Sequence, residues 1–297
     1  MDKPFLAKLR RIDPYVPGEQ PQSDDIIKLN ANENPYPPAP GVQQALRSFD
    51  ASRLALYPDA NGKALKTALA NRFGLNPSQV FLGNGSDDVL ALAFQSFFCS
   101  GEPILYPDIT YSFYPVWCDL FRIPYETVPL DENFCVRVRD YDRPNGGIVL
   151  PNPNAPTGRG VSLDFLEDLL QHNADCVVII DEAYVDFGAQ SAVPLIEKYE
   201  NLLVVQTMSK SRSLAGLRIG YALGSETLIA TLEAVKNSYN SYTMDAVALA
   251  AGEAAVKDEA YFQDTCRKVI ATRERAAEEL RKLGFTVSPS LTNFLFV

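Results

Sequence analysis

Short runs of apolar residues that end abruptly in polar residues recur along the chain. Clear examples are Gly-Ile-Val-Leu at 147–150, Cys-Val-Val-Ile-Ile at 176–180 and Leu-Leu-Val-Val at 202–205. Segments with the spacing of amphipathic helices, such as 113–121 and the one that begins at Ser162, lie between such runs. Continuous apolar strands that alternate with helices are typical of a parallel sheet buried on both faces. The pattern therefore predicts an α/β fold with a mostly parallel central sheet covered by helices.

Helical spacing dominates the last quarter of the chain, where the pattern predicts helices at 227–237, 244–256 and 260–283. Two apolar segments, 284–287 and 293–297, then predict strands of a second, smaller α+β domain. The chain stops inside the last of these predicted strands. We therefore expect this sequence to be a truncated version of a longer polypeptide.

This pattern divides the chain into three parts. The first stretch, rich in Pro, Asn and Asp, predicts an extended arm, which we assign to 1–47 and expect to contribute to the small domain. Residues 48–258 are expected to form the large domain and 259–297 the small C-terminal domain.

Composition excludes several classes of function. The net charge of −10 argues against a nucleic-acid partner, because the chain has no basic stripe to bind phosphates. No run approaches the ~18 apolar residues of a membrane span, and the N-terminus lacks the apolar core of a signal peptide. The five cysteines are odd in number, widely spaced and without a Cys-x-x-Cys pair, which favours free thiols in a reducing compartment. We expect a cytoplasmic protein without a membrane partner.

The chain has a single histidine, His172, in a polar segment. One histidine excludes His-rich metal sites and argues against a Ser-His-Asp triad, so we predict no metal site. The chemistry must come from lysine, tyrosine, carboxylates or a cofactor.

The polar cluster after the strand at 202–205 contains Ser209 and Lys210, and Arg218 follows eight residues later. A lysine at a strand exit can form a Schiff base, while hydroxyls and a guanidinium can hold a phosphate. Taken alone, Lys210 is more readily explained as a solvated loop lysine. The polar clusters at the other strand ends favour a role for Lys210 in a binding site, because ligands gather at the carboxyl ends of parallel strands.

The segment Gly83-Asn-Gly-Ser-Asp-Asp88 places Gly85, Ser86 and Asp87 at the start of a predicted helix. Backbone N–H groups and a hydroxyl at a helix N-terminus suit a phosphate dianion. A plain capped helix is the simpler alternative for this segment alone.

Three further strand ends carry candidate side chains. Asp181 ends a strongly apolar strand, where an unpaired carboxylate is costly, so it needs a cationic or hydrogen-bonding partner such as a protonated pyridine nitrogen. Tyr184, three residues later, can place its phenol in the same region. Asn154 offers a rigid amide between two prolines, and Tyr111 a ring face for stacking. By themselves, Asn154 is an ordinary turn residue and Tyr111 an ordinary core or surface tyrosine.

Taken together, these motifs resemble the fold-type-I, pyridoxal-phosphate-dependent aminotransferases. They are, in chain order, Gly-Ser-Asp, Asn-Pro-Asn-Ala-Pro-Thr-Gly, Asp-Glu-Ala-Tyr, Ser-Lys and Ala-Gly-Leu-Arg-Ile-Gly. Within that family, Asp-Pro-Tyr-Val-Pro-Gly at 13–18, Leu-Asn-Ala-Asn-Glu-Asn-Pro at 29–35 and Leu-Tyr-Pro-Asp at 56–59 resemble the histidinol-phosphate aminotransferases. The resemblance covers nearly the whole chain.

The resemblance implies a role for each candidate residue around pyridoxal 5'-phosphate. Lys210 would bind the cofactor covalently and move the substrate proton, and Asp181 would pair with the pyridine nitrogen. The remaining assignments are Tyr184 and Asn154 to the phenolic oxygen, Tyr111 to the ring face, Gly85, Ser86, Asp87, Ser209 and Arg218 to the phosphate, Tyr57 to the phosphate of the neighbouring subunit, and Tyr15 and Asn32 to the substrate pocket. The Tyr57 assignment implies a homodimer.

The sequence departs from the family pattern at two places. Many relatives have asparagine directly before Pro-Thr-Gly, where this chain has Ala155, and for this reason the amide role is assigned to Asn154. The resemblance also places the arginine that binds the substrate carboxylate beyond Val297.

The resemblance implies transamination of L-histidinol phosphate with 2-oxoglutarate, a step of histidine biosynthesis. Three alternatives remain open at this point. The same site suits an aromatic amino acid aminotransferase, a lyase similar to threonine-phosphate decarboxylase, or a degenerate paralogue that binds the cofactor without turnover.

Overall fold

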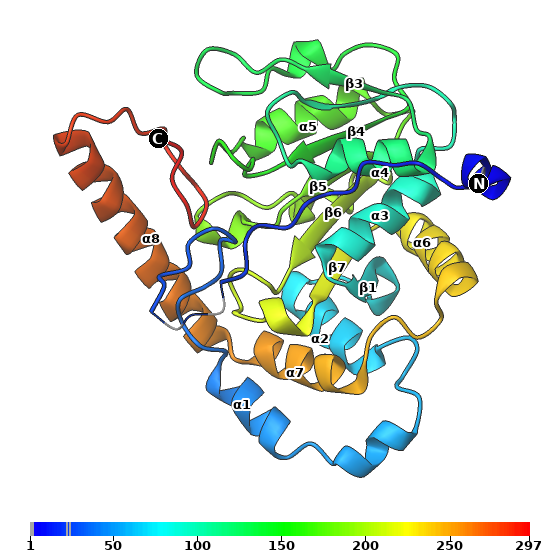
Figure 1. Ribbon diagram of the computed structural model, residues 1–297, viewed down its shortest axis with the longest axis vertical. Coiled ribbons are helices and arrows are strands. Elements are labelled where there is room, and N and C mark those ends of the chain that lie inside the picture. Colours follow the sequence, from blue (N-terminus) through cyan, green and yellow to red (C-terminus); the bar gives the residue numbers. More distant parts are fainter. Residues whose placement is uncertain (1–2, 22, 24) are drawn as a thin grey trace.

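The computed structural model describes residues 3–21, 23 and 25–297, and its centre is one seven-stranded sheet (Figure 1). The strands lie in the order β1-β7-β6-β5-β4-β2-β3. Their bounds are β1 (Val80–Asn84), β2 (Ile104–Pro107), β3 (Tyr125–Val128), β4 (Gly147–Pro151), β5 (Val178–Asp181), β6 (Leu202–Thr207) and β7 (Ile219–Gly224).

The sheet is parallel except at β7, which runs antiparallel to both β1 and β6. In β4, β5 and β6, Pro151 is paired with Asp181 and Asp181 with Val205, so these three strands end at the same edge. The prediction of a mostly parallel α/β sheet is confirmed. The register also brings three of the polar clusters found in the sequence to one side of the molecule.

Helices cover both faces of the sheet, as expected for strands that are apolar throughout. Alternate residues of a strand point to opposite faces, so that Ile148 packs with one hydrophobic cluster and Val149 with the other. The first cluster contains side chains of α2 (Lys63–Phe73), α5 (Leu163–His172) and α7 (Ala246–Lys257). The second contains side chains of α3 (Ser86–Phe97), α4 (Phe113–Phe121) and α6 (Glu226–Tyr239).

Short polar side chains fix where several of these helices begin. Ser162, Ser225 and Asp245 each precede a helix and accept a hydrogen bond from a first-turn backbone N–H. Such N-caps satisfy donors that have no partner within the helix. At the start of α3, by contrast, Gly85 precedes the helix and no side chain caps it.

The two ends of the chain lie outside the sheet layers. The N-terminal arm crosses the molecule to α1 (Pro40–Arg47), and the long α8 (Glu259–Lys282) carries a C-terminal segment that turns back toward the sheet (Figure 1). The strands predicted at 284–287 and 293–297 do not form. The segment has one backbone bond of ladder type, from Ser288 N to Phe296 O. Its other hydrogen bonds include ones to α8, to the loop after β4, to the N-terminal arm and to its own side chains.

Among the helices that the structure describes, none combines the length and the apolar composition that crossing a membrane requires.

A substitution at Gly220 of β7 tests how closely the sheet approaches the start of α3. A Cβ atom at Gly220 would overlap the backbone of Gly85 and Ser86, neither of which can move as a flexible side chain would. We expect Gly220→Ala to lower the free energy of unfolding by about 1–3 kcal/mol, the usual cost of overpacking. Denaturant unfolding measures this loss. Gly216→Ala is the matched control, since a Cβ atom there meets nothing within 4 Å, and an equal loss in both variants would contradict the close approach.

Candidate functional site

A cavity of about 920 Å³ opens where β4, β5 and β6 end, and it gathers most of the predicted site residues. Its lining includes Tyr15, Asn32, Ser86, Asp87, Tyr111, Asp181, Tyr184, Ser209, Lys210 and Arg218. Three predicted residues, Gly85, Asn154 and Tyr57, do not line it. The strand register explains the gathering, because it places residues from distant parts of the chain at one sheet edge.

Lys210 follows β6, and its side chain enters the cavity with little access to solvent. Its Nζ donates a hydrogen bond to the Ala31 carbonyl of the N-terminal arm at 2.7 Å and lies 5.6 Å from the centre of the Tyr184 ring. Burial lowers the pKa of this amine, while the nearby Asp87 carboxylate acts in the opposite direction. A partly desolvated lysine of lowered pKa is the form suited to nucleophilic attack on a carbonyl.

Asp181, the last residue of β5, is 5% exposed and faces the cavity. Its oxygens accept hydrogen bonds from Tyr114 Oη at 2.8 Å and from Ala183 N at 3.2 Å. Burial raises the pKa of this carboxyl to about 6. No lysine or arginine of the described residues forms an ion pair with it, so a cation placed in the cavity would find an unneutralised partner.

The start of α3 and Arg218 form a site suited to an anion. The first-turn N–H groups of a helix have no acceptor within the helix and point toward its N-terminus. Arg218 Nη2 lies 2.9 Å from Asp87 Oδ2 at this point. Gly85, with φ +89°, leaves the space for the guanidinium, because a Cβ atom there would lie 2.5 Å from Nη2. Gly85 therefore shapes the site without lining it.

Two tyrosines border the cavity between these charged groups. Tyr184 Oη accepts a hydrogen bond from Asn32 Nδ2 at 3.1 Å, and burial raises the pKa of this phenol to about 12. Tyr111 Oη donates to Asp87 Oδ1 at 3.0 Å, and burial together with that carboxylate raises its pKa. Both phenols therefore stay protonated at neutral pH and act as hydrogen-bond groups.

Asn154 is placed differently from the expectation. Its Nδ2 donates to Ile109 O at 2.9 Å and to Thr157 Oγ1 at 3.1 Å, and its Oδ1 accepts from Thr110. Both amide hydrogens are thus used within neighbouring loops, and the methyl-bearing Ala155 lines the cavity instead. The amide that we assigned to a ligand holds the 154–158 loop against the loop after β2.

Tyr57 lies outside the cavity of its own chain. Its side chain is 80% exposed, and its ring stacks on that of Tyr242 with 4.5 Å between the centres. The structure therefore presents both rings on the surface. In the part of the chain that the structure describes, Tyr57 stacks on Tyr242 and does not line the cavity.

Sequence reasoning missed several residues that build the site. Tyr114 bonds to Asp181, and Thr207 Oγ1 both donates to Ser209 Oγ and accepts from Ser209 N. The apolar wall formed by Phe294, Leu295 and Phe296 was assigned to a strand of another domain. The sequence could have identified Thr207 as a site residue, because it is a hydroxyl residue at the end of a buried strand. Tyr114 carried no such signal, because it is one of several aromatic residues in its helix.

Within the described residues, no group of three or more His, Cys, Asp and Glu side chains is arranged to hold a metal ion. The chemical groups of the cavity are the amines of Lys28 and Lys210, one buried carboxylate, phenols and an anion site.

Comparisons with known proteins agree with this chemistry. The family model described as "Aminotransferase class I and II" matches residues 24–297. The chain is 56% identical over 295 residues to the histidinol-phosphate aminotransferase of Acinetobacter baumannii strain SDF, covering 98% of this chain and 82% of that protein. It is 56% identical over 293 residues to the enzyme of the same name from Pseudomonas putida strain W619, covering 99% and 83%.

A solved structure is similar over most of its length. The crystal structure of histidinol-phosphate aminotransferase from Sinorhizobium meliloti in complex with pyridoxal-5'-phosphate has a TM-score of 0.81 and 27% identity, covering 89% of this chain and 73% of that one. Sequence, fold and site chemistry lead to one conclusion. The chain belongs to the class I and II aminotransferase family.

Proposed function

We propose that this protein is a pyridoxal-phosphate-dependent aminotransferase that transfers the amino group of L-histidinol phosphate to 2-oxoglutarate. One observation carries the cofactor part of the proposal. The buried Asp181 carboxylate, the partly desolvated Lys210 amine and the anion site at Arg218 line the same cavity. A pyridine ring with an aldehyde and a phosphate presents complementary groups to all three.

The residues present fit this cofactor in charge and in space. Asp181 would bind the ring nitrogen and keep it protonated, because a cation beside a buried carboxylate stabilises both charges. The start of α3, Ser209 and Arg218 would hold the phosphate. Tyr111 would contact the ring and Tyr184 the phenolic oxygen. Asn154 is left out of this set, because both of its amide hydrogens are donated elsewhere.

When bound, the cofactor withdraws electrons from the bond to the substrate Cα. The chain supplies the other steps. Asp181 would hold a proton on the ring nitrogen, and the Lys210 amine would accept and move the proton of the substrate Cα. Tyr184 would keep its own proton and orient the phenolic oxygen, since its pKa is raised to about 12.

The substrate part rests on the named relatives and on the arm. The curated relatives at 56% identity are histidinol-phosphate aminotransferases. Tyr15 and Asn32 of the arm line the cavity, and the Tyr15 ring stacks on Phe113 with 4.2 Å between the centres. Flat aromatic side chains of this kind suit an imidazole ring.

We also propose a cytoplasmic homodimer in which each site receives Tyr57 from the partner. Two observations support the dimer. Tyr57 is exposed and does not line its own cavity. Its neighbours in sequence, Leu54 and Leu56, are also exposed, and so is Tyr242, whose ring stacks on that of Tyr57. Large apolar side chains exposed in this way are typical of residues that an interface covers.

We predict that Lys210 carries the cofactor covalently. Borohydride reduction of the cofactor-loaded protein, followed by peptide mapping, should find the pyridoxyl group on Lys210, because its amine is the partly desolvated one. Lys28 is the internal control, since it also lines the cavity but is ion-paired with Glu33 at 2.8 Å. A pyridoxyl group on Lys28, or on no lysine, would contradict the assignment.

A substrate panel tests the reaction. We expect kcat/KM for L-histidinol phosphate to exceed that for L-phenylalanine and L-tyrosine by at least about tenfold, because one charge-assisted hydrogen bond to a phosphate contributes about 1.5–3 kcal/mol. The measurement follows the absorbance change of the cofactor on full-length protein. A higher kcat/KM for L-phenylalanine or L-tyrosine would contradict the proposed substrate and favour an aromatic amino acid aminotransferase. Release of carbon dioxide from L-threonine phosphate would contradict transamination and favour a lyase.

A mixed dimer tests the shared tyrosine. Tyr57→Phe alone should weaken cofactor binding about ten- to hundredfold, the range for one charge-assisted hydrogen bond. In a heterodimer of Tyr57→Phe with Lys210→Ala, sharing across the interface puts both defects into one site and leaves the other intact. The lysine-containing site should therefore bind the cofactor with wild-type affinity. A defect in that site, or a fully active monomer, rules out the shared tyrosine.

A further inference from the structure

The C-terminal segment 288–296 forms one wall of the cavity, although it belongs to no strand or helix. Phe294, Leu295 and Phe296 line the cavity. Leu291 N donates to Gly158 O at 2.9 Å, so the segment is also fixed to the loop that follows β4. The position of this wall relative to Tyr184 must come from contacts other than a sheet ladder.

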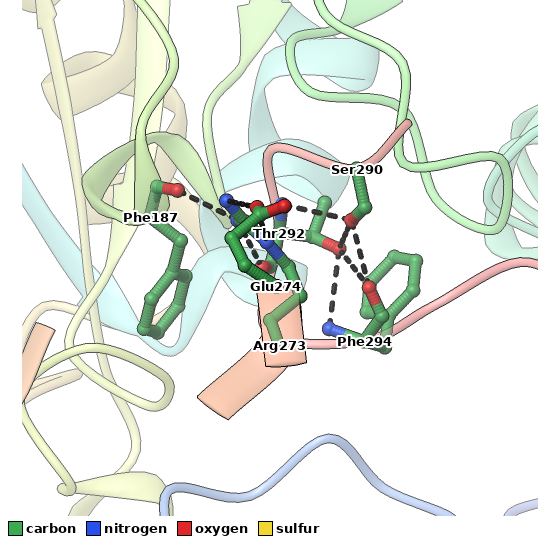
Figure 2. A network of polar contacts seen from close by, with 6 residues as sticks. All are labelled: Phe187, Arg273, Glu274, Ser290, Thr292 and Phe294. Atoms are coloured by element: carbon green, nitrogen blue, oxygen red, sulfur yellow. Dashed lines mark hydrogen bonds and ion pairs between the residues drawn. The ribbon is translucent and has the colours of Figure 1, made fainter. Parts of the chain in front are cut away.

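Hydroxyl groups hold the backbone of the segment in a tight turn. Thr292 Oγ1 donates to Phe294 O at 3.1 Å and accepts from Phe294 N at 3.3 Å. Ser290 Oγ also donates to Phe294 O, at 2.7 Å, and lies 2.8 Å from Thr292 Oγ1. Both backbone polar groups of Phe294 are therefore fixed by side chains of the same segment (Figure 2).

Arg273 of α8 connects this turn to the large domain. Its Nη1 donates to Thr292 O and to Phe187 O, each at 2.8 Å (Figure 2). Phe187 ends the short 3-10 turn Val185–Phe187, which begins directly after Tyr184. One nitrogen atom thus joins the turn directly after Tyr184 to the segment that carries Phe294.

Two residues of the segment act on Tyr184 itself. The Phe294 ring meets the Tyr184 ring edge to face, with 5.1 Å between the centres. Asn293 Nδ2 donates to Asn32 O at 2.9 Å, and Asn32 Nδ2 donates to Tyr184 Oη. A shift of the segment therefore changes both the packing of the Tyr184 ring and the arm residue that donates to its phenol.

We propose that Arg273 is a positioning residue that sets the Tyr184 side of the cavity through its two carbonyl contacts. Arg273 does not line the cavity, and its effect on substrate and cofactor rests on the proposed function. Arg273 is 7% exposed, and its Nη1 faces inward. The segment wall, the arm and Tyr184 then form one unit whose geometry depends on α8.

The ion pair with Glu274 does not explain the burial of Arg273. Arg273 Nε and Nη2 donate to Glu274 Oε1 at 2.9 and 2.6 Å, but the Glu274 side chain is 58% exposed. Surface pairs of this kind contribute little. The inward carbonyl contacts therefore distinguish Arg273 from an ordinary helix-surface cation, and removing the carboxylate should leave the wall in place.

The test compares Arg273→Met with matched variants by the affinity for pyridoxal phosphate, measured by absorbance well below the unfolding temperature. We expect Arg273→Met to raise the dissociation constant at least about tenfold and to change the visible circular dichroism of the bound cofactor, which reports the ring environment. Arg273→Lys should recover part of the affinity, because it keeps a cationic donor. Glu274→Gln and Arg281→Met should change it less than about twofold. Arg281 lies on the same helix α8 as Arg273 but donates to Val287 O, and neither Arg281 nor Val287 lines the cavity.

Hydrogen exchange of the cofactor-free protein gives a second readout that does not depend on the proposed function. Arg273→Met should speed exchange in peptides covering 288–297 and 28–34, whereas Arg281→Met should not. Thr292→Val, which leaves Arg273 intact, should speed exchange in the same peptides by a smaller factor. It replaces Arg273→Met in the test if that variant fails to fold. Wild-type affinity together with wild-type exchange at these peptides would overturn the proposal. Failure of the wild-type protein to bind pyridoxal phosphate would instead refute the proposed function. The exchange measurement would still decide whether Arg273 positions the segment, because it needs no cofactor.

Discussion

Burial of one carboxylate at the end of β5 is the constraint around which the site is built. Asp181 is held by Tyr114 from α4 and by the backbone of Ala183, and no described cation neutralises it. An unneutralised buried carboxylate is costly, which is why burial raises its pKa to about 6. The carboxylate faces the cavity, where the cofactor of the proposed function would place a cationic ring nitrogen. Lys210 and Arg218 reach the same cavity from β6 and from the turn before β7.

Both ends of the chain complete the cavity that the sheet begins. The arm brings Ala31 O to Lys210 Nζ, and Asn34 Nδ2 donates to Lys210 O and Ser211 O. The C-terminal segment meets the arm through Asn293. The arm thus bonds both to the C-terminal segment and to the loop that contains Lys210. Both segments therefore help to fix the geometry of the cavity. This explains how residues about 260 positions apart in sequence contribute to one pocket.

The sequence predicted the sheet and much of the site, for a physical reason. Apolar runs such as 176–180 must be buried on both faces, and parallel strands end at a common edge, so Asp181, Lys210 and Ser209 were expected to meet. It did not predict the contacts of Asn154, whose residue type suited a ligand role and whose two amide hydrogens are donated to neighbouring loops in the structure. The hydrogen-bond partners of a side-chain amide depend on loops that come together only in the folded chain.

The alternation of apolar and polar positions by itself determined the α/β class and the strand ends at which polar residues gather. The roles proposed for those residues came from the resemblance to a family. Tertiary structure decided how these groups are placed and tuned: Tyr114 against Asp181, Arg273 between Phe187 O and Thr292 O, and the C-terminal segment as a wall instead of a strand. The reason is that strand burial depends on local composition, which can be read along the chain. Hydrogen-bond partners and desolvation depend on residues distant in sequence, and those are fixed only when the chain packs.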